Sequence, residues 1–85
     1  MKNNVFVYGY TGEYAVYPKI QIYCDDKLIG EVSHRDSFEF RVEDDCVLVF
    51  KCSIRKAKIK VYKDKINKIS LEFNRFTGSL KAKYI

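Results

Sequence analysis

Apolar and polar residues alternate with a period of two along much of this chain, most clearly at residues 55–61. There Ala57, Ile59 and Val61 alternate with charged residues, as expected for a β-strand with one buried face and one face in water. Residues 46–50 are apolar at every position, so this run is apolar on both faces, which predicts a central strand. The alternation recurs at residues 20–24, 38–42, 69–73 and 80–84.

Turn-forming residues separate these runs at intervals of about 8 to 12 residues, the spacing expected of a sandwich or barrel. Residues 28–32 follow a tight turn and contain Gly30, which predicts a β-bulge or a point of close packing. Two further strand-like runs, 5–10 and 13–17, are rich in aromatic and β-branched residues. We therefore predict a single all-β domain over residues 1–85, an antiparallel β-sandwich of about seven or eight strands. A partly open β-barrel is the alternative.

A helical stripe in the C-terminal half gives a third alternative, an α+β fold with a C-terminal helix. Its apolar residues are spaced alternately three and four apart: Ile59, Tyr62, Ile66, Ile69, Phe73, Phe76 and Leu80. A helix would leave Val61 and Leu71 unexplained and would run through residues 63–65 without a stop signal. Two strands joined by a turn account for all of these positions, so we favour strands.

Length and composition place the chain among small globular domains. Of 85 residues, 47% are hydrophobic, which is enough for a core and argues against disorder. The longest apolar runs are far shorter than the ~20 residues needed to span a bilayer, so no transmembrane segment is expected. No secretory signal is visible at the N-terminus. We expect a soluble, cytoplasmic protein, although the chain could equally be one domain of a longer exported protein.

The three cysteines, Cys24, Cys46 and Cys52, are too few for the disulfide framework of a secreted mini-domain. Cys24 has the parity of the inward-facing Ile22, and the other two have the parity of Leu48, Phe50 and Ile54. The pattern predicts small buried hydrophobic side chains in a reducing compartment. A single disulfide or a reactive thiol remains open as an alternative.

The residue types that catalyse reactions or bind metals are not grouped in a recognisable motif. His34 is the only histidine, and it lies in a polar segment that predicts an exposed loop. The acidic clusters at 25–26 and 43–45 suit turns, where a carboxylate caps its own backbone, better than calcium or glycosidase chemistry. We therefore expect no catalytic residues, no metal and no cofactor.

Charge is strongly segregated along the chain. Residues 51–85 carry 11 Lys and Arg against 2 Asp and Glu, whereas residues 1–50 carry 5 against 9; the resulting +9 and −4 give the net charge of +5. The candidate polyanion-binding residues are Lys56, Lys58, Lys60, Lys81 and Lys83, with the N-terminal Phe6, Tyr8, Tyr10, Tyr14 and Tyr17 as candidates for base stacking. Lysines on edge strands also prevent sheets from pairing, and this explanation is the simpler one.

Residues 23–32, Tyr-Cys-Asp-Asp-Lys-Leu-Ile-Gly-Glu-Val, resemble the Asp-x-Lys-x-x-Gly hairpin of PEGA-like modules. These are small β-sandwich domains of bacterial surface and multidomain proteins, and the resemblance implies a non-catalytic binding or spacer role. The segment after Gly30 lacks the proline that such modules usually carry. We expect a non-enzymatic interaction module with a protein partner, and a homodimer through a sheet edge is also possible. A nucleic-acid-binding or polyanion-binding β-domain is the alternative.

Overall fold

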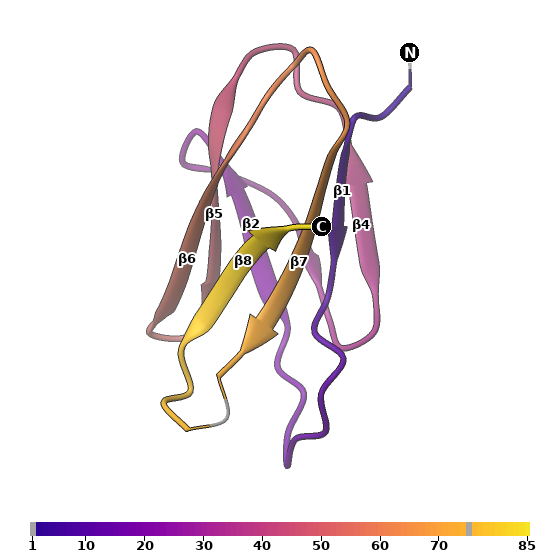
Figure 1. Ribbon diagram of the computed structural model, residues 1–85. Helices are drawn as coiled ribbons and strands as arrows, with labels where there is room; N and C mark the ends of the chain where they lie inside the picture. Colours follow the sequence, from indigo (N-terminus) through magenta and orange to yellow (C-terminus); the bar gives the residue numbers. More distant parts are fainter. Residues whose placement is uncertain (1, 75) are drawn as a thin grey trace.

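The computed structural model describes residues 2–74 and 76–85, and over these residues it forms two four-stranded sheets packed face to face (Figure 1). One sheet has the strand order β4-β1-β7-β8 and the other β3-β2-β5-β6. The predicted all-β sandwich is confirmed, and no strand pairs across the two sheets to close a barrel in these ranges. The strands are β1 (Val5–Tyr8), β2 (Ile20–Cys24), β3 (Lys27–Val32), β4 (Ser37–Phe40), β5 (Cys46–Cys52), β6 (Arg55–Val61), β7 (Asn67–Phe73) and β8 (Leu80–Tyr84).

The direction of one strand pair differs from the antiparallel arrangement that we predicted. β1 and β7 run parallel, with Val7 opposite Ile69, while the other five pairings over the described residues are antiparallel. A parallel pair needs a long crossover connection, and here the chain passes through the whole of the second sheet between the two strands. Alternation of apolar and polar residues shows which face of a strand is buried but not the direction in which the strand runs. The parallel pairing of β1 with β7 could therefore not be predicted from the sequence pattern.

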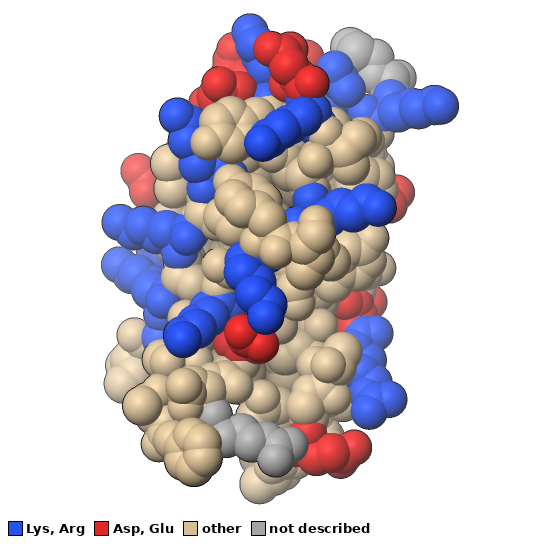
Figure 2. Space-filling view, in the orientation of Figure 1, with Lys and Arg blue, Asp and Glu red and all other residues tan. Residues whose placement is uncertain are grey.

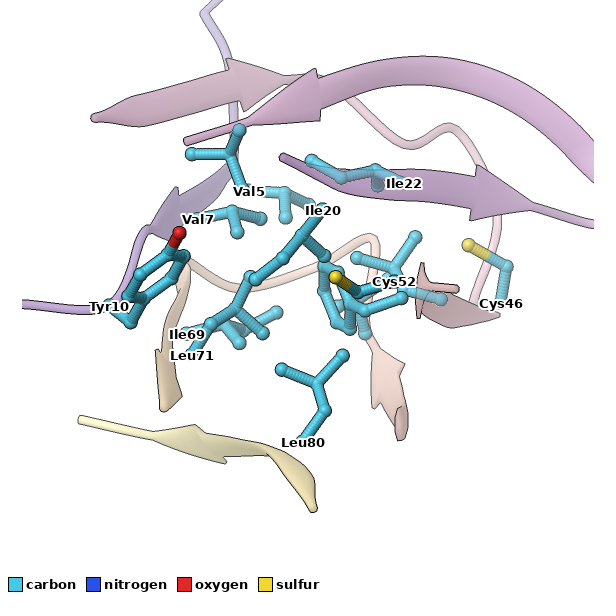
Figure 3. Close-up of a cluster of buried hydrophobic side chains, with 14 of the residues drawn as sticks. Val5, Val7, Tyr10, Ile20, Ile22, Cys46, Cys52, Ile69, Leu71 and Leu80 are labelled. Atoms are coloured by element: carbon cyan, nitrogen blue, oxygen red, sulfur yellow. The ribbon is translucent and has the colours of Figure 1, made fainter. Parts of the chain in front are cut away.

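The core fills the space between the sheets (Figure 3). Its buried apolar side chains are Val5, Val7, Tyr10, Ile20, Ile22, Val32, Val42, Cys46, Leu48, Phe50, Cys52, Val61, Ile69, Leu71 and Leu80. β5 lies between β2 and β6, as its apolar run predicts, and both Leu48 and Phe50 on it are fully buried. Burying a side chain of this size contributes about 1.5–3 kcal/mol. β5 therefore contributes a large share of the stability of a small domain.

Two buried asparagines hold the β6–β7 turn against β1. The Asn67 side-chain amide donates to the carbonyls of Asn4, Tyr62 and Lys65, at 3.2, 2.8 and 3.0 Å, and its Oδ1 accepts from the Tyr62 N–H at 3.0 Å. Asn4 adds a bond from its Nδ2 to the Tyr62 carbonyl and accepts from the Val42 N–H at 2.9 Å. Every one of these side-chain polar atoms has a partner, so the amides can be buried without a desolvation penalty.

The strand predicted at residues 13–17 is wrong, because the β1–β2 connection is held by aromatic side chains instead of a ladder. Tyr10 is buried, and its hydroxyl donates to the Pro18 carbonyl at 2.6 Å. The Tyr14 hydroxyl donates to the Phe73 carbonyl at 3.1 Å, and the ring of Tyr10 packs edge-on against that of Tyr14. These contacts anchor the connection through its side chains, and residues 15–17 are exposed, so their backbone groups can bond to water instead of pairing in a ladder.

His34 also belongs to this aromatic cluster and is half-buried, whereas the sequence predicted an exposed loop residue. Its ring stacks on Tyr17 with the centroids 4.0 Å apart. Its Nε2 lies 2.9 Å from the Gly12 carbonyl, and since a carbonyl only accepts, Nε2 carries the proton in this contact. The histidine is thus a packing residue of the β1–β2 connection.

Two glycines mark points where the chain packs too closely for a side chain. At Gly30, as predicted, a bulge interrupts the β2–β3 register, and a Cβ would lie 2.4 Å from the Phe38 ring. At Gly9, just after β1, a Cβ would lie 2.1 Å from the Ser33 carbonyl oxygen. The Gly9 N–H donates to the Asp36 carbonyl at 2.8 Å, so the backbone just after β1 contacts the backbone of the β3–β4 connection directly.

Candidate binding surfaces

The first candidate surface is a lysine row on β6, an edge strand of its sheet. Lys56, Lys58 and Lys60 are exposed and point away from the core, as alternation predicts. Successive members stand about 6.8 Å apart, since a strand rises about 3.4 Å per residue. Their cross-strand neighbours on β5 are Lys51, Val49 and Val47. The row therefore combines positive charge with apolar surface.

The second lysine pair, Lys81 and Lys83, lies on β8, the edge strand of the other sheet. β6 and β8 pack side by side at the same edge of the sandwich, and the Tyr84 hydroxyl donates to the Lys60 carbonyl. Figure 2 shows Lys and Arg side chains gathered where these two strands lie. We call the five lysines at 56, 58, 60, 81 and 83 the basic edge. The fold brings together two rows that are about 20 residues apart in sequence.

Most of the basic edge has no neutralising partner. Lys83 Nζ lies 3.4 Å from Glu72 Oε1, but no carboxylate within the described ranges forms an ion pair with Lys56, Lys58, Lys60 or Lys81. Unpaired like charges on one edge repel each other and produce a local positive potential that an acidic ligand would relieve. Lys83 is consequently the weakest of the five candidates.

The aromatic residues beside the basic edge are not the ones that the sequence suggested. Lys65 Nζ lies 4.4 Å from the centroid of Tyr62 and 5.8 Å from that of Tyr84. Burial, with a smaller contribution from Tyr62, raises the pKa of Tyr84, so its hydroxyl stays protonated and able to donate. Of the N-terminal candidates, Tyr10 is buried in the aromatic cluster and cannot stack on an external base.

The other candidate surface is an apolar end of the sandwich formed by three connections. Val16 in the β1–β2 connection, Ile54 between β5 and β6, and Phe76 between β7 and β8 are 72%, 94% and 99% exposed. We call these three side chains the loop end. Ile54 has the parity of the buried Cys52, yet it is exposed, because β5 ends at Cys52 and the chain turns at Ser53, whose φ is 57°.

A hollow of about 240 Å³ lies beside the loop end, between the β1–β2 connection, the β7–β8 connection and the start of β6. It is lined by Tyr14, Ala15, Val16, Pro18, Arg55, Phe73, Asn74 and Gly78. Arg55 borders it as the only charged lining residue among the described residues, and its Nε donates to the Gly78 carbonyl. Figure 2 shows mainly uncharged atoms over this end of the molecule. Arg55 is the first residue of β6 and Lys56 the next, so the hollow lies at the end of the strand that carries the lysine row.

The acidic turns lie mainly at the opposite end and serve the backbone. Asp25 and Asp26 both have positive φ, 51° and 65°, as in the two-residue turn of a β-hairpin. The Asp45 carboxylate accepts from the Lys63 N–H at 2.9 Å. Over residues 2–74 and 76–85, no group of three or more His, Cys, Asp or Glu side chains is arranged to hold a metal ion.

The cysteines are free thiols, with Cys46 and Cys52 buried and Cys24 half-buried. This arrangement agrees with their prediction as apolar packing residues. Burial, together with the hydrogen bond to Cys24, raises the pKa of Cys46 to about 12, so Cys46 keeps its proton at neutral pH.

Comparison of the chain with protein-family models, with curated proteins and with solved structures finds no match. Among the residues described, no helix has the length and apolar character to cross a bilayer.

The sequence missed the loop end and the tyrosines of the basic edge. Its best signal for the loop end was an apolar residue inside a turn, where polar residues usually stand: Ile54 after Ser53, and Phe76 after Asn74. No local signal could place those turns beside each other, because their contact depends on the packing of the two sheets.

Proposed function

We propose that the protein is a non-enzymatic binding module that contacts a protein partner through the loop end of the sandwich. The observation that carries this proposal is the exposure of Val16, Ile54 and Phe76 on three connections at one end of the sandwich, beside a hollow that Val16 lines. Isolated exposed apolar residues are ordinary, but apolar tips gathered at one end of a domain are typical of contact surfaces. Burying these apolar side chains against a partner would remove their surface from water, and this hydrophobic effect would favour binding.

The basic edge indicates which chemical groups the partner's surface should carry. Arg55 and Lys56 stand where the loop end meets the lysine row on β6. A protein surface with an apolar centre and an acidic border would match both features, because charge complementarity adds on-rate and selectivity to apolar contact. The hairpin resemblance at residues 23–32 supports the same non-catalytic class of role.

Loss of the loop end should abolish partner capture. We expect Ile54→Ser combined with Phe76→Ser to reduce recovery of the cross-linked partner by about 30-fold, the effect of losing roughly 2 kcal/mol at a hot spot. The measurement is quantitative mass spectrometry of proteins cross-linked to the purified chain in its native cell extract. Circular dichroism should show that the variant keeps its β structure, since both side chains are exposed.

The matched control is Leu28→Ser combined with Ile66→Ser. These residues are 53% and 59% exposed and lie away from the loop end, so the control removes exposed apolar side chains elsewhere, although with a smaller exposed area than the loop-end pair. A partner that depends on the loop end is retained by the control and lost by the loop-end variant. The loop end would be refuted as the contact surface if the wild type, the loop-end variant and the control recovered the partner equally. Equal loss with the loop-end variant and the control would refute it as well.

Polyanion binding at the basic edge is a second candidate function, and it rests on the unpaired lysines of β6. The test is Lys56→Glu, Lys58→Glu and Lys60→Glu together, which changes the net charge by −6, from +5 to −1. All three side chains are exposed, so the variant should stay folded with about 0.5 kcal/mol or less lost per site.

The leading proposal expects the wild type to show no affinity for heparin or single-stranded DNA near physiological salt, the lysines serving to keep β6 from pairing with other sheets. Binding that falls linearly with the logarithm of salt concentration, and that the triple variant loses, would establish the polyanion candidate instead. Fluorescence anisotropy over a salt series distinguishes the two outcomes.

A homodimer through a sheet edge remains a prediction. The basic edge disfavours pairing at β6 and β8, so the available edges are β3 and β4 on the other side of the sandwich. Sedimentation velocity over a concentration series tests this state, and the triple lysine variant should sediment like the wild type.

A further inference from the structure

The thiols of Cys24 and Cys46 meet at the end of the sandwich opposite the loop end. Cys24 is the last residue of β2 and Cys46 the first of β5, and their Sγ atoms lie 3.1 Å apart. Cys24 pairs in register with Leu48, so Cys46 is its diagonal neighbour on the inward face of the same sheet. The two side chains therefore point at each other across adjacent strands.

We propose that Cys24 and Cys46 form an oxidation site, at which a peroxide converts the two thiols to an intrachain disulfide. An S–S bond is about 2.05 Å long, so the sulfur atoms must approach by about 1 Å. Both residues lie at strand ends, Cys24 beside the Asp25–Asp26 turn and Cys46 after the connection from β4, where the backbone can shift without breaking a central ladder.

A small oxidant has a route to the pair. A hollow of about 210 Å³ is lined by both cysteines together with Asp25, Ile29, Phe40, Arg41, Val42, Glu43 and Asp44. This space is several times the roughly 30 Å³ that a water molecule occupies in the liquid, so a peroxide fits. Cys24 is the more exposed of the two thiols, whereas Cys46 is buried, so the first attack falls to Cys24.

The chemistry balances with a hydroperoxide as the oxidant. The Cys24 thiolate attacks one peroxide oxygen, so an S–O bond forms, the O–O bond breaks, and the leaving oxygen takes up the thiol proton. Cys46 then attacks the sulfur of the Cys24 sulfenic acid, the S–O bond breaks, and the Cys46 proton leaves with hydroxide as water. With hydrogen peroxide, two thiols and one peroxide give one disulfide and two waters.

Cys52 provides an internal control. It lies six residues from Cys46 along β5, about 20 Å away at the rise of a strand, and is buried; Figure 3 shows the two side chains well separated. It cannot reach either partner without unfolding. Oxidation of the folded chain should consequently leave one free thiol of the three.

The test is limited hydrogen peroxide treatment of the folded chain, followed by alkylation, intact mass analysis and peptide mapping. The expected product is a monomer that has lost two hydrogen atoms, with a Cys24–Cys46 linkage and one alkylated cysteine. Its melting temperature should rise by roughly 10–20 °C, because a loop of about twenty residues is closed, and dithiothreitol should reverse the shift.

Three variants keep the proposal open to refutation. Cys52→Ala should still form the disulfide, whereas Cys24→Ala should not; Cys46→Ala should stop at a sulfenic acid on Cys24 that dimedone traps. Since Cys46 is buried, Cys24→Ala gives the decisive result if Cys46→Ala does not fold. A disulfide that involves Cys52, an intermolecular dimer, or three free thiols after treatment would each overturn the assignment.

Discussion

Replacing Asn67 with Ala should destabilise the protein by roughly 3–4 kcal/mol and lower its melting temperature by about 15–25 °C. The Asn67 side chain makes four hydrogen bonds to backbone groups, and it is 1% exposed. Alanine would leave the Tyr62 N–H without its acceptor and the Lys65 carbonyl without its donor in a site that water reaches poorly. Thermal unfolding followed by circular dichroism measures the effect.

The appropriate control is Asn3→Ala. Asn3 makes a single exposed hydrogen bond, from Nδ2 to Glu39 Oε1 at 3.2 Å, so its loss should change the stability by about 0.5 kcal/mol or less. An 85-residue domain has a total stability of only about 4–13 kcal/mol, so the loss at Asn67 is a large fraction. If the Asn67→Ala and Asn3→Ala variants had the same melting temperature, the amide network would not hold the β6–β7 turn.

Replacing Gly9 with Ala should be at least as damaging, with a loss of roughly 3–5 kcal/mol. The added Cβ would stand 2.1 Å from the Ser33 carbonyl oxygen and 3.2 Å from that of Asp36. Both obstacles are backbone atoms, so relief requires moving the β3–β4 connection away from β1. The midpoint of urea unfolding, at an unchanged slope, measures the difference.

Gly78→Ala is the matched control for this prediction. Gly78 has a φ of 73°, a conformation that costs alanine about 1 kcal/mol, and its added Cβ would first meet the Arg55 guanidinium, 2.8 Å away. That side chain can move, whereas the carbonyls near Gly9 cannot. A Gly78→Ala variant less stable than Gly9→Ala would contradict the close-approach argument.

The sequence predicted the strands well because each strand buries one face, and burial imposes a period of two. It predicted Lys56, Lys58 and Lys60 on an exposed face for the same reason. It could not predict that β8 lies beside β6, since this adjacency follows from the strand order of two sheets and leaves no periodic trace. Topology thus limited the prediction of the site more than local structure did.

Residues 13–17 and Ile54 show the other limit. Both continue an alternating pattern. The first segment is nevertheless held by the Tyr14 hydroxyl, which bonds to the distant Phe73 carbonyl, and Ile54 follows a turn at Ser53. In each case a tertiary contact or a single backbone dihedral overrides a strand propensity. The loop end, which depends on both segments, could therefore not be predicted from the sequence.

The parallel pairing of β1 with β7 has a consequence for synthesis. The second sheet can assemble from residues 20–61 as they emerge, because two of its three pairings are local hairpins. The first sheet cannot, since Val5 must wait for Asn67 to be made. Until then one side of β1 is an open edge, so the nascent chain passes through a state that can pair with other chains. Pairing across so long a separation also places folding in the slow, millisecond-to-second range of β-rich domains.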